Sequence, residues 1–285
     1  MMIDRIRGSG WLPSGLRSRA VALITAQAVV LDAGHKASPL ARVLQPQSVR
    51  QTGSWTENLT EHLTAAMHEL LQMMDDAHVT RQRLHLVVSD FFSRPAFIPV
   101  PKRPRHDGAL LALITGHYRH VYGDPMADWR FCWQHHGGQL RAVAWPTTAL
   151  SVLTNGLAKR QCVLALARPL GLEVATRLPS LPDALWLALI SQQCASLFRL
   201  QRGLLQDWIV CTDTCPSHSV PLQLARSAAL RDDDCQNLWV LDLNCADDTA
   251  LLRQTLTARG WTWHQVSPTD LTPHWVWPLH PKTAQ

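Results

Sequence analysis

The chain has 285 residues, of which 46% are hydrophobic and 17% charged, which is enough apolar material for one large domain or two smaller ones. This composition excludes an intrinsically disordered chain. The net charge of +5 arises from 27 basic and 22 acidic residues without a dense basic run, which argues against a nucleic-acid-binding protein. An anionic membrane surface or an acidic partner stays open.

The N-terminal region predicts a flexible segment followed by a strand. Residues 1–19 contain three glycines and a proline, and residues 20–31 are apolar and partly β-branched. The apolar run is well short of the ~20 residues that span a bilayer. No small-residue cleavage site follows it in the expected way, so we expect a buried strand rather than a signal peptide. The protein is therefore expected to be cytoplasmic.

Strand and helix patterns then alternate through the chain, and no internal repeat is identified. The expected strands are 42–45 with 48–51, 84–88, 95–99, 129–133, 140–145, 172–178, 195–200, 204–211, 238–243 and 261–266. The expected helices are 56–77, 110–122, 146–167, 183–190, 220–230 and 247–259. Glycines between strands predict two hairpins, one turning at Gly137-Gly138 and one at Gly203. We expect Trp129 and Trp145 to lie in the core of the first hairpin.

Two sets of His and Cys residues are spaced closely enough in the sequence to be considered as incomplete metal sites. His117 and His120 are three residues apart on one predicted helix, so their imidazoles could share a face. Cys211, Cys215 and His218 resemble an incomplete zinc knuckle. Neither set is completed at a known ligand spacing, and we expect no metal; whether either set meets one in the fold stays open.

The remaining histidines and cysteines do not define a reactive centre. His135 and His136 precede the diglycine and are expected at the end of the hairpin. The seven cysteines lie mostly in apolar runs at irregular spacing, which predicts free thiols rather than disulfides. The sequence identifies no particular Cys and His as a nucleophile and its base, although residues far apart in the chain can form such a pair in the fold.

Polar residues stand at the ends of several expected elements. Asp90 follows a buried strand, Arg94 begins the next extended piece, and Asp124 follows Gly123 at a helix end. One interpretation is structural, with Asp90 capping a turn and pairing with Arg94. The alternative is that Asp90, Arg94 and Asp124 line the rim of a docking face.

The order of elements over residues 20–266 resembles the actin-like, ribonuclease-H-like cytoplasmic domains of bacterial secretion and pilus platforms. The similar proteins are the L protein of type II secretion and the M and I proteins of type IV and mannose-sensitive haemagglutinin pili. The residues that carry the resemblance are 86–90, Arg94, Ile98-Pro99, 118–124, Trp129, 142–179 and 197–208. They include no catalytic motif.

The resemblance implies an α/β protein of two lobes, each with a mixed sheet flanked by helices. The expected organisation is a flexible segment at 1–19, a first actin-like subdomain at 20–168, a second at 169–267, and a Pro- and Trp-containing tail at 268–285. It further implies a scaffold whose partners are a motor ATPase or an inner-membrane component. L-type members continue into a transmembrane helix, which this sequence does not show.

A nucleotide site is the second implication of the resemblance. In nucleotide-binding actin-like proteins an Asp-x-Gly after the first strand faces the metal and phosphate, and Asp32 and Gly34 hold that pattern here. A second phosphate loop with an Asp is expected within the later hairpin, where residues 199–203 offer no carboxylate. No Walker-type or dinucleotide-type glycine pattern is present. We therefore expect no cofactor, with ATP and magnesium disfavoured.

Three functions follow as hypotheses. The first is a non-enzymatic cytoplasmic adaptor that holds partner peptides at its sheet edges. The second is an actin-like nucleotide-binding protein that uses Asp32 and Gly34. The third is a small hydrolase or transferase whose site is assembled only in the fold. The sequence favours the adaptor, without identifying its partner, its pathway or its oligomeric state.

Overall fold

The structure is a computed structural model. It describes residues 19–34, 39–44, 55–100, 107–123, 128–136, 138–175, 178, 182–191, 194–212, 216–231, 235–243 and 246–266. Contacts divide the chain into two compact units, Met1–Pro169 and Leu170–Gln285. Among the helices described, none combines the length and apolarity needed to cross a membrane.

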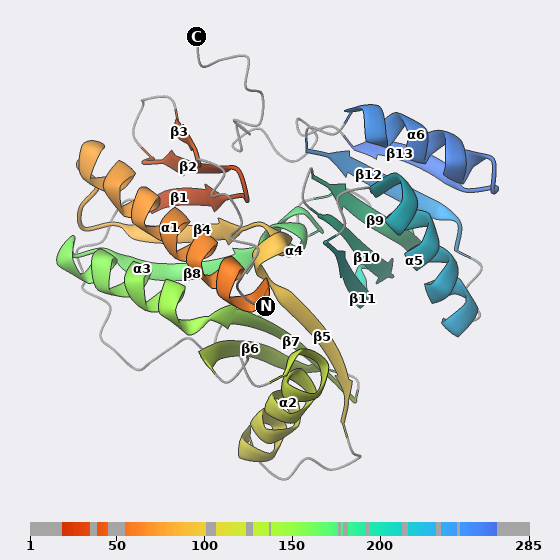
Figure 1. Ribbon diagram of the computed structural model, residues 1–285, viewed down its shortest axis with the longest axis horizontal. Coiled ribbons are helices and arrows are strands. Elements are labelled where there is room, and N and C mark those ends of the chain that lie inside the picture. The colour runs from red at the N-terminus through yellow and green to blue at the C-terminus, as the bar shows by residue number, and fades with distance from the viewer. Residues whose placement is uncertain are drawn as a thin grey trace. The chain divides into compact units, whose positions relative to one another are not determined.

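The first unit contains a mixed five-stranded sheet in the order β3-β2-β1-β4-β8 (Figure 1). Its strands are β1 (Arg19–Ile24), β2 (Ala28–Asp32), β3 (Leu40–Val43), β4 (Arg83–Val88) and β8 (Val163–Pro169). β1, β2 and β3 pair antiparallel, whereas β4 pairs parallel with both β1 and β8. The apolar residues of β1 and β4 are buried, as expected of central strands that carry side chains into the core.

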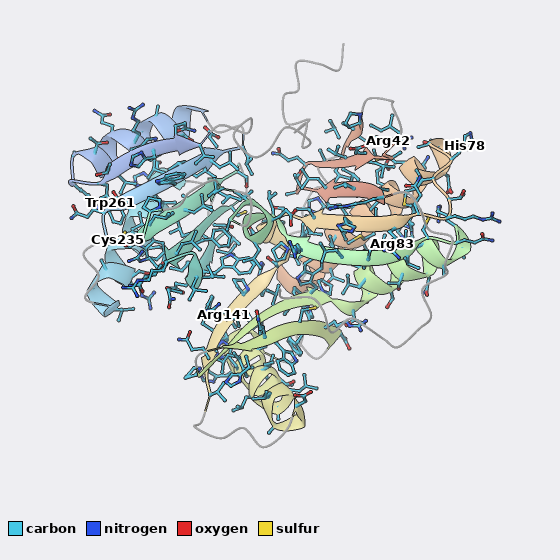
Figure 2. The ribbon with its side chains drawn as sticks, turned by 180° about the vertical axis from the view of Figure 1, so that it is seen from behind. Arg42, His78, Arg83, Arg141, Cys235 and Trp261 are labelled. Atoms are coloured by element: carbon cyan, nitrogen blue, oxygen red, sulfur yellow. The ribbon has the colours of Figure 1, made fainter. Side chains whose placement is uncertain are left out.

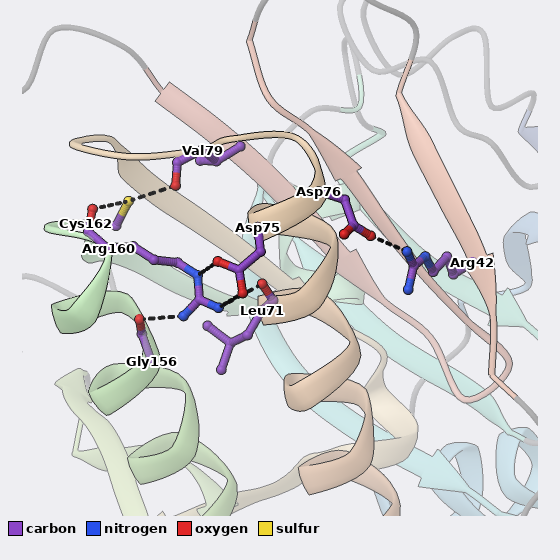
Figure 3. Close-up of polar contacts among 8 residues, drawn as sticks. All are labelled: Arg42, Leu71, Asp75, Asp76, Val79, Gly156, Arg160 and Cys162. Carbon is purple, nitrogen blue, oxygen red and sulfur yellow. Dashed lines mark hydrogen bonds and ion pairs between the residues drawn. The ribbon is translucent and has the colours of Figure 1, made fainter.

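Helices α1 (Trp55–Asp76) and α3 (Thr147–Lys159) lie side by side on this sheet (Figure 1). Gly156 permits their close approach, since a Cβ at this position would lie 2.3 Å from Leu71 Cδ1. Arg160, at the end of α3, fastens the two helices together (Figure 3). Its guanidinium donates to the Gly156 carbonyl at 2.7 Å, to the Leu71 carbonyl at 3.0 Å and to the carboxylate of Asp75. The same helix α1 is tied to β3 by Arg42, which bonds Asp76 (Figure 3).

An insertion separates β4 from α3. It begins with a 3-10 turn, η1 (Asp90–Phe92), and continues with β5 (Arg94–Pro99), α2 (Asp107–Tyr122), β6 (Trp129–His136) and β7 (Gln139–Pro146). The three strands form an antiparallel sheet in the order β5-β7-β6, which confirms the predicted first hairpin. Trp129 and Trp145 are both buried at 5% exposure, as predicted.

The second unit contains a five-stranded sheet in the order β11-β10-β9-β12-β13. Its elements are α4 (Leu170–Ala175), β9 (Ala184–Ile190), β10 (Ala195–Gln201), β11 (Leu204–Cys211), α5 (Pro216–Arg231), β12 (Asn237–Asp242), α6 (Ala246–Thr257) and β13 (Thr262–Val266). α5 and α6 lie side by side on the sheet (Figure 1). A buried core joins them to it, with Ile190 and Val240 from the strands, Leu224 from α5 and Leu252 from α6.

The two sheets repeat one topology. In each unit two antiparallel pairings link the first three strands, a helix follows, and the fourth strand pairs parallel with the first and with the last. Two mixed sheets flanked by helices confirm the predicted α/β class.

Four predicted elements are wrong. Residues 20–31 form the hairpin β1–β2 rather than one strand, because Thr25 closes a tight turn at their middle. The predicted helix 183–190 is the central strand β9, and the predicted helix 146–167 ends at Lys159, before strand β8. The predicted strand at 172–178 is partly occupied by α4. Of the predicted strand at 42–45 with 48–51, the structure describes residues 42–44, of which the first two belong to β3; residues 45–51 lie outside the described ranges.

Candidate functional site

The turns after the first strand of each unit are the candidate site, since this is where an actin-like protein places phosphate-binding loops. In the first unit the turn runs from Thr25 to Ala28. The Thr25 backbone N–H donates to the Ala28 carbonyl at 2.8 Å. The Thr25 hydroxyl accepts from the backbone N–H of Ala28 at 2.9 Å and of Gln27 at 3.3 Å. It also donates to the Ala28 carbonyl at 3.1 Å.

The second unit closes its first hairpin in the same way. The Ser191 backbone N–H donates to the Cys194 carbonyl at 2.9 Å, and its hydroxyl donates to that carbonyl at 2.9 Å. The Cys194 N–H donates in return to the Ser191 hydroxyl at 3.2 Å. Each turn therefore directs its own hydroxyl and N–H groups inward to itself.

The end of the first strand is also held alike in the two units. The Ile24 carbonyl accepts from the Ser89 N–H at 2.7 Å, and the Ile190 carbonyl accepts from the Leu243 N–H at 2.8 Å. In both cases the donor is the residue that directly follows the fourth strand. The equivalence of the two turns is thus fixed by backbone bonds as well as by strand order.

A short sequence repeat underlies this equivalence. Residues 22–28 read Ala-Leu-Ile-Thr-Ala-Gln-Ala, and residues 188–194 read Ala-Leu-Ile-Ser-Gln-Gln-Cys. The repeat is too short to be found by composition, and it becomes recognisable once β1 and β9 are known to be equivalent strands.

Asp32 and Gly34, the residues expected to bind nucleotide, lie elsewhere on the first hairpin. Asp32 ends β2 and pairs with Val21, whereas the Thr25 turn joins the opposite ends of β1 and β2. The Asp32 carboxylate accepts from the Gly34 N–H at 2.9 Å. Gly34 has a φ of +68°, and a Cβ there would lie 2.5 Å from the Arg19 carbonyl oxygen. These contacts account for both residues as parts of a turn, and their role in nucleotide binding stays a prediction.

An aromatic cluster adjoins the Thr25 turn and was not anticipated from the sequence. His62 of α1 contacts the ring of Phe92 edge-on, with centroids 5.3 Å apart, and that of Phe91 at 6.4 Å. Burial lowers the pKa of His62, opposed by a hydrogen bond to the backbone of Ala26. The turn is therefore joined to His62 through Ala26, and His62 in turn packs against the two phenyl rings. The Phe91-Phe92 pair directly after Asp90 was the available sequence signal.

Asp90 and Arg94 both lie within the fold, at 2% and 7% exposure. The side chain that caps η1 is that of Ser89, whereas Asp90 contributes its carbonyl, which accepts from Ser93. The Arg94 guanidinium donates to the carbonyls of Phe91 at 2.9 Å and Ser93 at 2.8 Å. Asp124 lies outside the described residues, so the docking rim stays a prediction.

The predicted metal sets are only partly within the described chain. Over the described residues there is no group of three or more His, Cys, Asp or Glu side chains arranged to hold a metal ion. His117 packs edge-on against Tyr118, and its pKa is lowered by burial and by the nearby His120. Cys211 is buried in the second core, and Cys215 lies outside the described residues.

His218 and His135 lie on exposed positions of α5 and β6. The side chain of His136 falls outside the described part of the chain. Five cysteines of the described chain are free thiols: Cys132, Cys162, Cys194, Cys211 and Cys235.

Comparison with known proteins identifies the fold. No protein-family profile and no curated protein matches the chain. Among solved structures, it resembles a "PilM-PilN type IV pilus biogenesis complex" with a TM-score of 0.61 and 16% identity over 90% of each chain. It also resembles a Bacteroides thetaiotaomicron protein of unknown function with an actin-like ATPase fold, with a TM-score of 0.56 and 10% identity over 91% of this chain and 95% of that one.

The cytoplasmic domain of EpsL, an inner-membrane component of the type II secretion system of Vibrio cholerae, matches with a TM-score of 0.49 and 11% identity. This match covers 79% of the present chain and 82% of the EpsL chain. At their identities, the first two likenesses, with TM-scores of 0.61 and 0.56, establish the actin-like fold alone.

Proposed function

We propose that this protein is a non-enzymatic, cytoplasmic adaptor of a bacterial pilus or secretion assembly platform, where it binds protein partners. The observation that carries the proposal is the likeness to the PilM-PilN complex across 90% of both chains. The partners would be a motor ATPase or an inner-membrane component, and the protein would reach the membrane through them.

The geometry of the two turns supports an adaptor over a nucleotide-binding protein. A phosphate is bound by backbone N–H groups and side-chain donors that point at the ligand. In the Thr25 turn the N–H groups of Gln27 and Ala28 are directed at the Thr25 hydroxyl, and Ser191 and Cys194 are joined likewise. Neither arrangement offers a carboxylate for magnesium within the described residues of the turns.

Partner identification tests the proposal. The tagged, full-length protein is cross-linked in its native host, purified and analysed by mass spectrometry, with a tagged unrelated cytoplasmic protein as the control. We expect pilus or secretion platform components to be enriched with the tagged protein and absent from the control. Enrichment of metabolic enzymes alone would contradict the proposal.

Calorimetric titration with ATP and magnesium tests the competing nucleotide hypothesis. We expect no binding in the micromolar range, with Asp32→Ala indistinguishable from the unaltered protein. Micromolar binding that is lost in Asp32→Ala would establish the actin-like nucleotide-binding function instead.

A further inference from the structure

The inserted sheet β5-β7-β6 has two faces of different character. Directly opposed residues of antiparallel strands share a face. Phe131 contacts Tyr118 of α2, with ring centroids 4.9 Å apart, so its face is the one covered by α2. Side chains alternate between the two faces along each strand, so the residues next to Phe131, and those paired with them, lie on the other face. We call this the Arg141 face. Its members that are at least partly exposed are Pro95, Phe97, Arg130, Cys132, Gln134 and Arg141, whereas Val143 and Trp145 on the same face are buried at 3% and 5% exposure.

Arg141 stands at the middle of this face, on the central strand β7 (Figure 2). Register places it directly opposite Phe97 on one side and Gln134 on the other. Its Nε is buried and has no hydrogen-bond partner among the described residues. Burial lowers its pKa, and no described acidic group opposes this effect. A buried N–H group without a hydrogen-bond partner costs free energy of folding.

The insertion is also the basic part of the chain. Residues 94–146 hold seven Arg and Lys residues against three Asp residues, a net charge of +4 out of +5 for the whole chain. The strands β5, β6 and β7 contain no Asp or Glu at all. A carboxylate for Arg141 is therefore not available from its own sheet.

We propose that the Arg141 face binds an acidic segment of a partner protein, with a carboxylate of that segment accepting hydrogen bonds from the Arg141 guanidinium. Arginine forms paired, charge-assisted hydrogen bonds with carboxylates. Phe97 and Pro95 beside it offer apolar contact for neighbouring side chains of the segment, and Arg130 offers a second positive charge. Arginine and aromatic residues are enriched at the energetic centres of protein interfaces.

A protein segment fits this face better than a nucleic acid or a membrane. Nucleic-acid binding draws its affinity from many phosphate contacts, and anionic membranes are bound by clusters of about four to eight basic residues. The Arg141 face has two cations, set among half-buried apolar side chains. One or two carboxylates beside apolar residues match that composition.

Binding is tested on the full chain by fluorescence anisotropy with a labelled peptide of alternating Glu and Leu. A peptide of alternating Lys and Leu is the control for charge. We expect saturable binding of the acidic peptide only, weakened at least about tenfold by Arg141→Met. Arg226→Met, which removes an exposed arginine of α5 in the second unit, is the matched control and should leave affinity unchanged.

Two further measurements separate binding from folding. Arg141→Met should unfold at the same or a higher temperature, because it removes an unpaired, desolvated cation. Gln134→Glu places a carboxylate directly opposite Arg141, so it should stabilise the fold and weaken peptide binding by competing for the guanidinium. A lowered melting temperature in Arg141→Met with undiminished peptide binding would mean that Arg141 serves the fold, and the proposal would be lost.

The proposal is also overturned if the acidic peptide does not bind below about 1 mM. A third contrary result is Arg141-dependent binding to phosphatidylcholine vesicles containing phosphatidylglycerol, without peptide binding. The inference rests on the proposed adaptor function only in taking a protein as the occupant. If platform components are captured equally by Arg141→Met, this inference fails while the adaptor function stands.

Discussion

The two units share one sheet topology, but only the first is interrupted after its fourth strand. In the first unit β4 is followed by η1, β5, α2, β6 and β7 before α3 begins, whereas in the second α6 begins at Ala246, shortly after β12 ends at Asp242. In both units the turn after the first strand is closed by a hydroxyl side chain, that of Thr25 in the first unit and that of Ser191 in the second. The insertion holds most of the net positive charge, and it contains Arg141, whose buried Nε has no hydrogen-bond partner among the described residues. The two five-stranded sheets with their helices are thus a repeated scaffold, and the insertion from η1 to β7 is the part that distinguishes the first unit.

The largest expected effect breaks the insertion itself. Trp129→Ala removes a side chain that is 5% exposed, and truncating a buried aromatic costs about 3–5 kcal/mol of unfolding free energy. Chemical denaturation measures the loss. Trp133→Ala, on the same strand and only half-buried, is the control and should cost less. An unchanged stability of Trp129→Ala would show that the insertion is not built around this residue.

The next prediction compares the change in unfolding free energy when each of two helix glycines of the first unit is replaced by alanine. Gly156→Ala overpacks the contact of α3 with Leu71, and we expect a loss of about 1–3 kcal/mol. Gly116→Ala on α2 meets nothing within 4 Å and should gain up to about 1 kcal/mol from helix propensity. Opposite signs in denaturation experiments support the close α1–α3 packing. A gain from both substitutions would contradict it, and Leu71→Ala should relieve the loss at Gly156→Ala.

The equivalence of the two turns is tested by removing their hydroxyls. Thr25→Val and Ser191→Ala each delete the side-chain bonds that close a hairpin, and each should cost about 0.5–1.5 kcal/mol. Similar losses in thermal unfolding would agree with two equivalent turns. Thr154→Val, which removes an exposed hydroxyl bonded within α3, is the control and should cost less. A large loss of stability in only one of the two turn variants would show that the two turns are not equivalent.

The smallest effect concerns pH. Burial lowers the folded-state pKa of His62 below its ordinary 6.5, so the unfolded chain takes up a proton first as pH falls. This contribution to stability is present above pH 6.5 and is lost as pH falls from there through the folded-state pKa. His62→Phe should reduce the stability difference between pH 7.5 and pH 5.5, measured by denaturation at each pH.

His117 has a lowered pKa as well, so it contributes to the pH dependence with the same sign. His117→Gln separates its share, and the double variant should show the weakest pH dependence of the set. If His62→Phe changes stability equally at both pH values, the imidazole is not held neutral by the turn and its aromatic neighbours.

Sequence reasoning succeeded where local signals agree with the fold. Glycine marked the turn of the β10–β11 hairpin at Gly203, and the alternating Trp-bearing strands predicted β6 and β7. The predictions failed where strands rich in Ala and Leu lack alternation. Strand β9 reads Ala-Leu-Trp-Leu-Ala-Leu-Ile and is buried on both sides, and this sequence favours a helix by propensity. Strand β8, a mostly half-buried edge strand, reads Val-Leu-Ala-Leu-Ala-Arg-Pro and continues the helical pattern of α3 for the same reason of propensity.

The boundary of the first strand also differs from the prediction. The sequence predicts one strand over residues 20–31, with Asp32 directly after it, whereas in the structure Thr25 follows the first strand and Asp32 ends the second; a role of Asp32 in nucleotide binding stays a prediction. The Thr25 turn contains no Gly, Pro, Asn or Asp, so the usual turn signals are missing. Its hydroxyl replaces them by accepting the N–H groups that would otherwise be unpaired.

Apolar patterning along short stretches of chain was enough to predict the order of most elements and the buried tryptophans, whereas the actin-like class was predicted from a resemblance to known proteins. The repetition of the two sheets, the equivalence of Thr25 with Ser191 and the position of Arg141 opposite Phe97 and Gln134 became visible in the tertiary structure. Strand pairing joins residues far apart in sequence, and whether a charge has a partner depends on which side chains that pairing brings to the same face.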